Sequence, residues 1–112
     1  MMTKLKEAVK ALIAQELSMA SKDYGDRFHS AHEAYAVILE EYEEAKEELN
    51  NIEYALADFW GCVRFPDYSD DHEQNAHLSD LERTAINAAC ECIQIAAMAR
   101  KAQTEYGDSK HE

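Results

Sequence analysis

Residues 30–63 contain the strongest structural signal of the chain, in the order SAHEAYAVILEEYEEAKEELNNIEYALADFWGCV. Apolar residues recur in this stretch at steps of three and four: Tyr35, Ile38, Leu39, Tyr42, Ala45, Leu49, Ile52, Leu56, Phe59 and Val63. This period is typical of one face of an α-helix. Ser30 and Glu33 at its start have the spacing of a capping box. We therefore predict a long helix over 30–63, of the kind that packs nearly antiparallel in a bundle.

Two further helices follow from the same patterns. Apolar residues at three- and four-residue steps predict a short first helix over about 4–24. Ser79 and Glu82 repeat the capping-box spacing and predict the start of a third helix over about 79–105. Gly and Pro are scarce, and β-branched or aromatic runs typical of strands are missing. The prediction is an all-α chain with one short and two long helices.

The segment between the two long helices lacks any apolar period. Residues 64–78 contain Pro66, several Asp residues, and His72 and His77 without a metal-ligand spacing. We predict a polar loop for this segment. At 112 residues the chain is long enough for one core, so residues 1–112 are predicted to form a single domain.

The charge and the cysteines restrict the class of partner. A formal net charge of −12 disfavours direct binding of nucleic acid or of anionic lipid. No signal-peptide core and no run of about 18 apolar residues is present, so we expect a cytoplasmic protein that does not enter a membrane. Cys62, Cys90 and Cys92 form neither a disulfide set nor a CxxC pair, and we expect them to be small buried hydrophobic residues.

The third helix contains one charge in an otherwise apolar stretch. Residues 84–99 read TAINAACECIQIAAMA, in which Glu91 is the single ionisable carboxylate. A helix so apolar is expected to be buried on most faces, and three helices of one chain cannot easily surround it. We therefore expect a homo-oligomer, either a dimer or a tetramer.

Glu91 needs a partner if it is buried, because an unpaired carboxylate in an apolar interior costs several kcal/mol. It could meet a cation, meet a buried donor, be protonated, or lie on a narrow exposed strip. In the second helix, Glu41, Glu44 and Glu48 share one flank of the apolar face, whereas Glu40 lies on the far side. If Glu41 and Glu44 face Glu91, their hard oxygen atoms suit Mg²⁺ or Mn²⁺.

Two segments resemble a known family. The stretches HSAHEAYAVILEEYEEAKEEL (29–49) and ECIQIAAMARKA (91–102) resemble the MazG-like branch of the all-α nucleoside triphosphate pyrophosphohydrolases. The family has EExxE on one helix and ExxD on a later one. The first motif corresponds here to Glu40, Glu41 and Glu44.

The second motif corresponds to Glu91 and Gln94, where the family has an aspartate at the latter position. The resemblance implies that Glu41, Glu44, Glu91 and Gln94 bind Mg²⁺ and that the four glutamates, Glu40 included, are catalytic. It implies a hydrolase that cleaves a nucleoside or deoxynucleoside triphosphate to the monophosphate and pyrophosphate. It further implies an oligomeric, four-helix-type bundle with sites at subunit contacts.

Two alternative functions stay open at this stage: a non-catalytic helical module, and a helical regulator that binds a basic protein, for which the only support is the negative net charge. Gln94 offers a neutral carbonyl where the family has a carboxylate. The chain could therefore be a non-catalytic helical module that retains the bundle, with or without nucleotide or metal binding. Trp60 belongs to an aromatic group with Phe59, Phe65 and Tyr68, which could form core, contact another subunit, or stack on a base.

Overall fold

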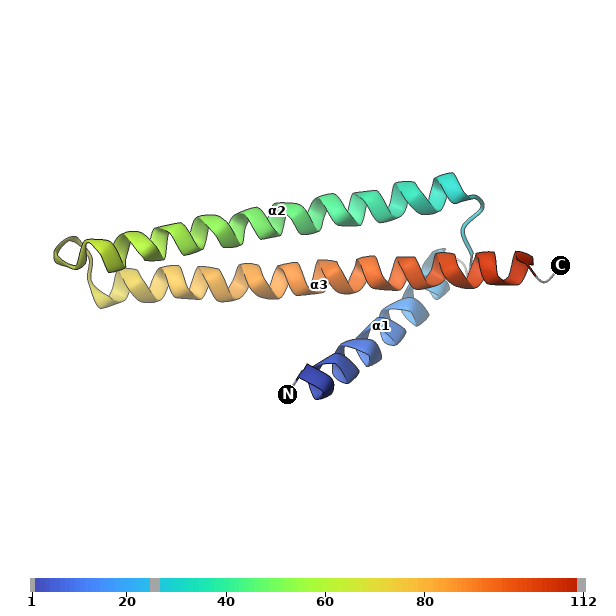
Figure 1. The fold of residues 1–112 in the computed structure, drawn as a ribbon, viewed down its shortest axis with the longest axis horizontal. Coiled ribbons are helices and arrows are strands. Elements are labelled where there is room, and N and C mark those ends of the chain that lie inside the picture. The colour runs from blue at the N-terminus through green and yellow to red at the C-terminus, as the bar shows by residue number, and fades with distance from the viewer. Residues whose placement is uncertain (1, 25–26, 111–112) are drawn as a thin grey trace. The chain divides into compact units, whose positions relative to one another are not determined.

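The structure is a computed structural model that describes residues 2–24 and 27–110, with side chains described over 2–20 and 27–103. Its elements are α1 (Met2–Tyr24), α2 (Ala31–Arg64), the 3₁₀ helix η1 (Pro66–Tyr68) and α3 (Asp71–Lys110) (Figure 1). The described residues contain no strand, so the predicted all-α fold with one shorter and two long helices is confirmed. Within the same residues, no helix combines the length and apolarity that crossing a bilayer requires.

The start of α2 matches the predicted capping box. The Ser30 hydroxyl accepts a hydrogen bond from the backbone N–H of Glu33 at 3.1 Å. The Glu33 carboxylate in turn accepts one from the backbone N–H of His29, also at 3.1 Å. The first bond satisfies an N–H group of the first helical turn that has no intrahelical partner. The second differs from a regular capping box by one residue, because its donor is His29 rather than Ser30.

The predicted start of the third helix is wrong. Asp70 caps α3, because its Oδ1 accepts a hydrogen bond from the backbone N–H of Glu73 at 2.8 Å. Asp71 and Glu73 place negative charge in the first turn, where the helix dipole favours it. Ser79, the expected cap, lies inside the helix. The Asp-x-x-Glu pattern has the same capping spacing as Ser79 and Glu82, and it occurs first along the chain.

The predicted polar loop over 64–78 is correspondingly shorter. Only residues 65–70 separate α2 from α3, and three of them form η1. The backbone N–H of Phe65 donates to the Gly61 carbonyl at 3.1 Å, and that of Tyr68 donates to the Phe65 carbonyl at 3.0 Å. His72 and His77 are therefore helical residues of α3.

The chain, predicted as one domain, consists of two compact units. Unit 1 comprises Met1–Tyr42 and Glu91–Glu112, and unit 2 comprises Glu43–Cys90. Both long helices run from one unit into the other, so each unit contains part of α2 and part of α3. Unit 1 contains α1 in addition.

Unit 1 has a core drawn from all three helices and the segment before α2. Its buried residues are Phe28, Ala34, Ala97, Met98 and Ala102, and Ile13, Leu17, Ala20, Val37 and Ile38 pack against them. Lys101 is buried beside this core, with its Nζ 4.3 Å from the centroid of the Phe28 ring. The aromatic face offers this ammonium an electrostatically favourable neighbour.

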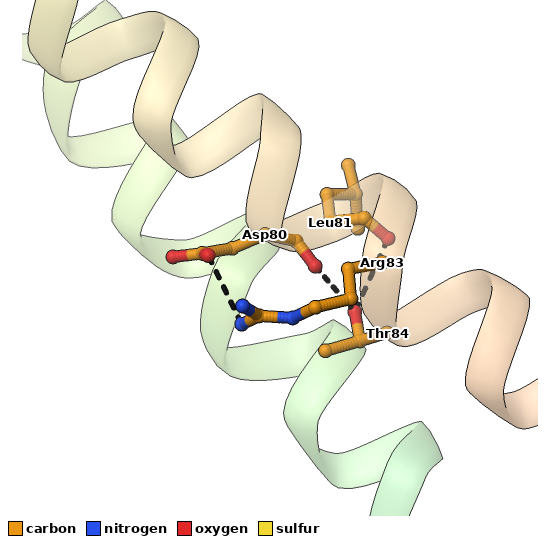
Figure 2. A network of polar contacts seen from close by, with 4 residues as sticks. All are labelled: Asp80, Leu81, Arg83 and Thr84. Carbon is orange, nitrogen blue, oxygen red and sulfur yellow. Dashed lines mark hydrogen bonds and ion pairs between the residues drawn. The ribbon is translucent and has the colours of Figure 1, made fainter.

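Unit 2 is an antiparallel hairpin of two helices (Figure 1). Its buried side chains are small: Ala45, Ala55, Cys62, Thr84 and Ala88. The Thr84 hydroxyl lies within hydrogen-bond distance of the carbonyl oxygens of Asp80 (3.0 Å) and Leu81 (3.1 Å), as Figure 2 shows. A bond back to the preceding turn satisfies this polar group without a partner from α2.

The large apolar residues of α2 are more exposed than a bundle predicts. Five of them, at seven-residue intervals, are between 49% and 68% exposed: Tyr35, Tyr42, Leu49, Leu56 and Val63. Of the aromatic group, Trp60, Phe65 and Tyr68 are also exposed, which excludes the core interpretation for these three.

The expectation that residues 84–99 are buried on most faces holds for only part of the segment. Ala97 is completely buried in unit 1, whereas Ile86 in unit 2 is 56% exposed. The cysteines divide similarly, because Cys62 is buried as expected and Cys90 and Cys92 are exposed. Unit 2 contains no counterpart of α1 to cover the outer face of α3.

Candidate metal centre

Two of the predicted site residues approach each other from different helices of unit 1. Glu41 lies on α2 and Glu91 on α3, and both are half-buried. A carboxylate oxygen of Glu41 lies within 4.8 Å of one of Glu91. Glu91 therefore does not face bulk water alone, and the proximity expected from its isolated position in the sequence is observed.

Glu44 adds a third carboxylate along the same helix. It follows Glu41 by three residues of α2, so the two share one face of that helix. Glu44 belongs to unit 2 and its side chain is exposed. Like charges at this spacing destabilise a helix by roughly a few tenths of a kcal/mol in the absence of a compensating cation.

The other acids of α2 differ in environment. Glu40 is exposed, and a rotation of about 100° along the helix separates it from Glu41. Glu48, one turn beyond Glu44, is half-buried, and its Oε2 is a buried atom without a hydrogen-bond partner among the described residues. A buried carboxylate oxygen of this kind is the type of atom that a cation or an ordered water satisfies.

Gln94 forms a hydrogen bond with Glu16, a residue that the sequence did not mark as part of the site. Its side-chain amide donates a hydrogen bond to Oε2 of Glu16 at 2.9 Å. Glu16 lies on α1, and both side chains are half-buried in unit 1. The sequence contained a signal for this placement, because Glu16 follows Ile13 by three residues and therefore shares the face of α1 that packs on the core.

The hydrogen bond gives a reason for an amide at position 94. An aspartate there would bring a second carboxylate towards Glu16, and two like charges at hydrogen-bond distance repel strongly. Gln94 instead acts as a donor to the acid on α1. The amide at position 94 is thus matched by an acid from α1.

The donor set of this centre suits a hard divalent cation. Mg²⁺ binds oxygen atoms at about 2.1 Å in an octahedron, which separates neighbouring ligands by about 2.9 Å and opposite ones by about 4.2 Å. Oxygens of Glu41 and Glu91 lie within 4.8 Å of each other, which is close to the separation of two ligands of one ion. All the candidate ligands, Gln94 included, offer oxygen rather than nitrogen or sulfur.

No family model, curated protein sequence or solved structure matches this chain significantly.

Proposed function

We propose that this protein is a Mg²⁺-dependent, MazG-like nucleotide pyrophosphohydrolase of the cytoplasm. The observation that carries the proposal is the approach of the Glu41 and Glu91 carboxylates from two helices, within 4.8 Å. Carboxylates at such a separation, both half-buried, form a site of strong negative potential that favours a divalent cation. The resemblance of residues 29–49 and 91–102 to that family supplies the reaction class.

The reaction joins a water oxygen to phosphorus and breaks a phosphoanhydride bond, releasing a nucleoside monophosphate and pyrophosphate. Glu41, Glu44 and Glu91 are assigned to hold the metal, with Gln94 next to them on α3. When bound, Mg²⁺ (or Mn²⁺) offsets the charge of the phosphates and makes a coordinated water more acidic. Triphosphate oxygens would supply further ligands to such an ion.

Glu40 is assigned as a base that accepts a proton from the attacking water. Its exposed position on α2 separates this role from metal binding. Replacing Glu40 by glutamine should therefore lower kcat more than it lowers metal affinity, because the amide cannot accept the proton.

Pyrophosphate release from a panel of ribo- and deoxyribonucleoside triphosphates, with Mg²⁺ or Mn²⁺, tests the proposal. We expect turnover by the wild type and its loss in Glu41→Gln and Glu91→Gln, which keep side-chain size and remove charge. Glu47→Gln, an exposed acid of the same helix, is the matched control and should retain activity. A wild type that neither releases pyrophosphate nor changes its thermal stability with metal would reject the proposal.

A second candidate function, a non-catalytic helical module, is favoured by the hydrogen bond between Gln94 and Glu16. In this alternative the amide has a structural role in joining α1 to α3. Comparison of Gln94→Asp with the double variant Glu16→Gln/Gln94→Asp separates the two functions. If the protein binds metal, the double variant should bind Mg²⁺ more tightly than the wild type. If it is only a scaffold, the single variant should unfold more easily, and the double variant should regain the lost stability without binding Mg²⁺ more tightly.

We also propose that the protein is a homo-oligomer, with two or four copies assembled as a four-helix-type bundle. The support is the exposed apolar series of α2, which consists of Tyr35, Tyr42, Leu49, Leu56 and Val63. A seven-residue repeat of apolar side chains is the pattern that helices use to pack against another helix. A second copy offers an identical series, which permits a symmetric contact.

A further inference from the structure

Three side chains with metal-ligating atoms meet in unit 2, where α2 ends and α3 begins. Cys62 lies in the last turn of α2, and Glu73 and His77 lie in the first turns of α3. The Cys62 sulfur, a Glu73 oxygen and a His77 ring nitrogen all lie within 4.8 Å of one another. None of the three belongs to the carboxylate centre of Glu41 and Glu91.

The local backbone holds these residues in place. Asp70 caps α3 through the backbone N–H of Glu73, so the cap positions that residue directly. His77 follows Glu73 by four residues and shares its helix face. On the opposite side, the Ser69 hydroxyl donates to the backbone carbonyl of Cys62 at 3.3 Å. Both halves of the cluster are thus tied to the short connection between the helices.

A cavity opens beside the cluster. It has a volume of about 570 Å³, and its walls include Cys62, Glu73 and His77 together with Phe65 and Tyr68. Cys62 itself is only 4% exposed, so its sulfur is reached from this cavity rather than from an open surface. The cavity leaves room for a water or a small ligand on an ion held by the three side chains.

The chemistry of the three groups points to zinc. Zn²⁺ takes Cys sulfur, His nitrogen and carboxylate oxygen in a tetrahedron, and the usual bond lengths separate such ligands by about 3.3–3.6 Å. A thiolate disfavours Mg²⁺ or Ca²⁺, which select oxygen. One thiolate and one carboxylate also balance the two positive charges of the ion.

We propose that Cys62, Glu73 and His77 form a zinc-binding site that joins the end of α2 to the start of α3. The three protein ligands leave the fourth coordination position open to the cavity, as in sites that bind a water or an exogenous ligand. The sequence alone does not suggest this site, because it predicts a loop at His77 and an apolar environment for Cys62.

Titration of the reduced full-length chain with Co²⁺, a spectroscopic substitute for zinc, tests the proposal. We expect one equivalent to produce a thiolate-to-cobalt charge-transfer band and the visible bands of tetrahedral cobalt, and Zn²⁺ to displace it. Binding of Zn²⁺ should release the thiol proton, measurable by calorimetry in buffers of different ionisation enthalpy. It should also raise the thermal midpoint of unfolding.

Substitutions of the proposed ligands test which side chains bind the metal ion. Cys62→Ser should abolish the charge-transfer band, and His77→Gln should weaken Zn²⁺ binding by at least about tenfold, a loss that even outer-shell partners of metal sites cause. Cys90→Ser and His72→Gln remove the same groups elsewhere on α3 and should leave binding unchanged.

Absence of the band in the wild type, or its retention in Cys62→Ser, overturns the proposal. His77 and Glu73 are at least partly open to solvent. Glu73→Gln should weaken Zn²⁺ binding as His77→Gln does, so these two variants decide the question even if Cys62→Ser fails to fold. Ions bound at the carboxylate centre produce no thiolate band and are therefore not mistaken for this site.

Discussion

The two units use the same long helices but bury them differently. Unit 1 adds α1 to parts of α2 and α3, and its core includes Phe28 and Met98. Unit 2 pairs α2 with α3 alone, and its buried side chains are small, whereas Leu49, Leu56 and Trp60 remain about half exposed. A helix pair can cover only one stripe of each helix, so a third neighbour is needed to bury large residues on a second face.

Burial in this protein therefore depends on the number of neighbouring helices as well as on the size of the residue. Among the large residues of α3, Ile86 in unit 2 is exposed, whereas Met98 in unit 1 is buried. The aromatic residues show the same contrast, because Phe28 is 5% exposed and Phe65 is 50% exposed. The comparison predicts that equivalent substitutions have unequal effects in the two units.

The largest expected effect is that of Phe28→Ala in unit 1. Truncation of a buried phenylalanine typically costs about 3–5 kcal/mol, and here it also removes the ring beside Lys101. Urea unfolding followed by circular dichroism measures the loss. The matched control, Phe65→Ala in unit 2, should lower the free energy of unfolding by less than about 1 kcal/mol, in line with effects at exposed sites. Equal losses for the two variants would remove the contrast between the units.

An intermediate effect is expected for Leu56→Lys, which places a charge in the exposed apolar series of α2. Burial of a leucine contributes about 1.5–3 kcal/mol, so the substitution should weaken self-association by about tenfold or more. Sedimentation velocity over a range of protein concentrations measures the change. Tyr54→Lys, on an exposed residue outside the seven-residue series, serves as control. A wild type that stays monomeric at every concentration would refute the proposed oligomer.

The smallest effect concerns the connection in unit 2. Asp70→Ala removes the side chain that caps α3 and should lower the free energy of unfolding by about 1 kcal/mol. Ser79→Ala, at the start predicted from the sequence, lies inside the helix and should change stability by less than about 0.5 kcal/mol. Thermal unfolding measures the stability of both variants. A larger loss of stability in Ser79→Ala than in Asp70→Ala would indicate that the helix begins at Ser79 instead.

Much of the fold was predictable from the chain, but less of the chemistry was. The apolar period and the Ser30–Glu33 pair located α2 to within a residue at each end. For α3, two capping patterns competed, and polar residues such as His72 and Asn75 made the earlier pattern look like part of a loop. The helix nevertheless begins at Asp71, because the Asp70 side chain and the early acids stabilise its first turn.

The sequence also marked some residues of the candidate sites and not others. A single charge in an apolar stretch marked Glu91, and the flank of α2 suggested Glu41 as its neighbour. Nothing as distinctive marked Glu16, which meets Gln94 from α1, or the approach of His77 to Cys62. Each of these pairs joins residues that are distant in the sequence and become neighbours only when the helices pack.

Helix type, approximate length and capping follow from contacts between residues no more than four positions apart, and such contacts can be read directly from the order of amino acids. Which side chains from different helices meet depends instead on the rotation and register of one helix against another, and these follow from packing of the whole core. For this reason the all-α architecture was evident from the chain, whereas the partners of Gln94 and Cys62 became apparent only in three dimensions.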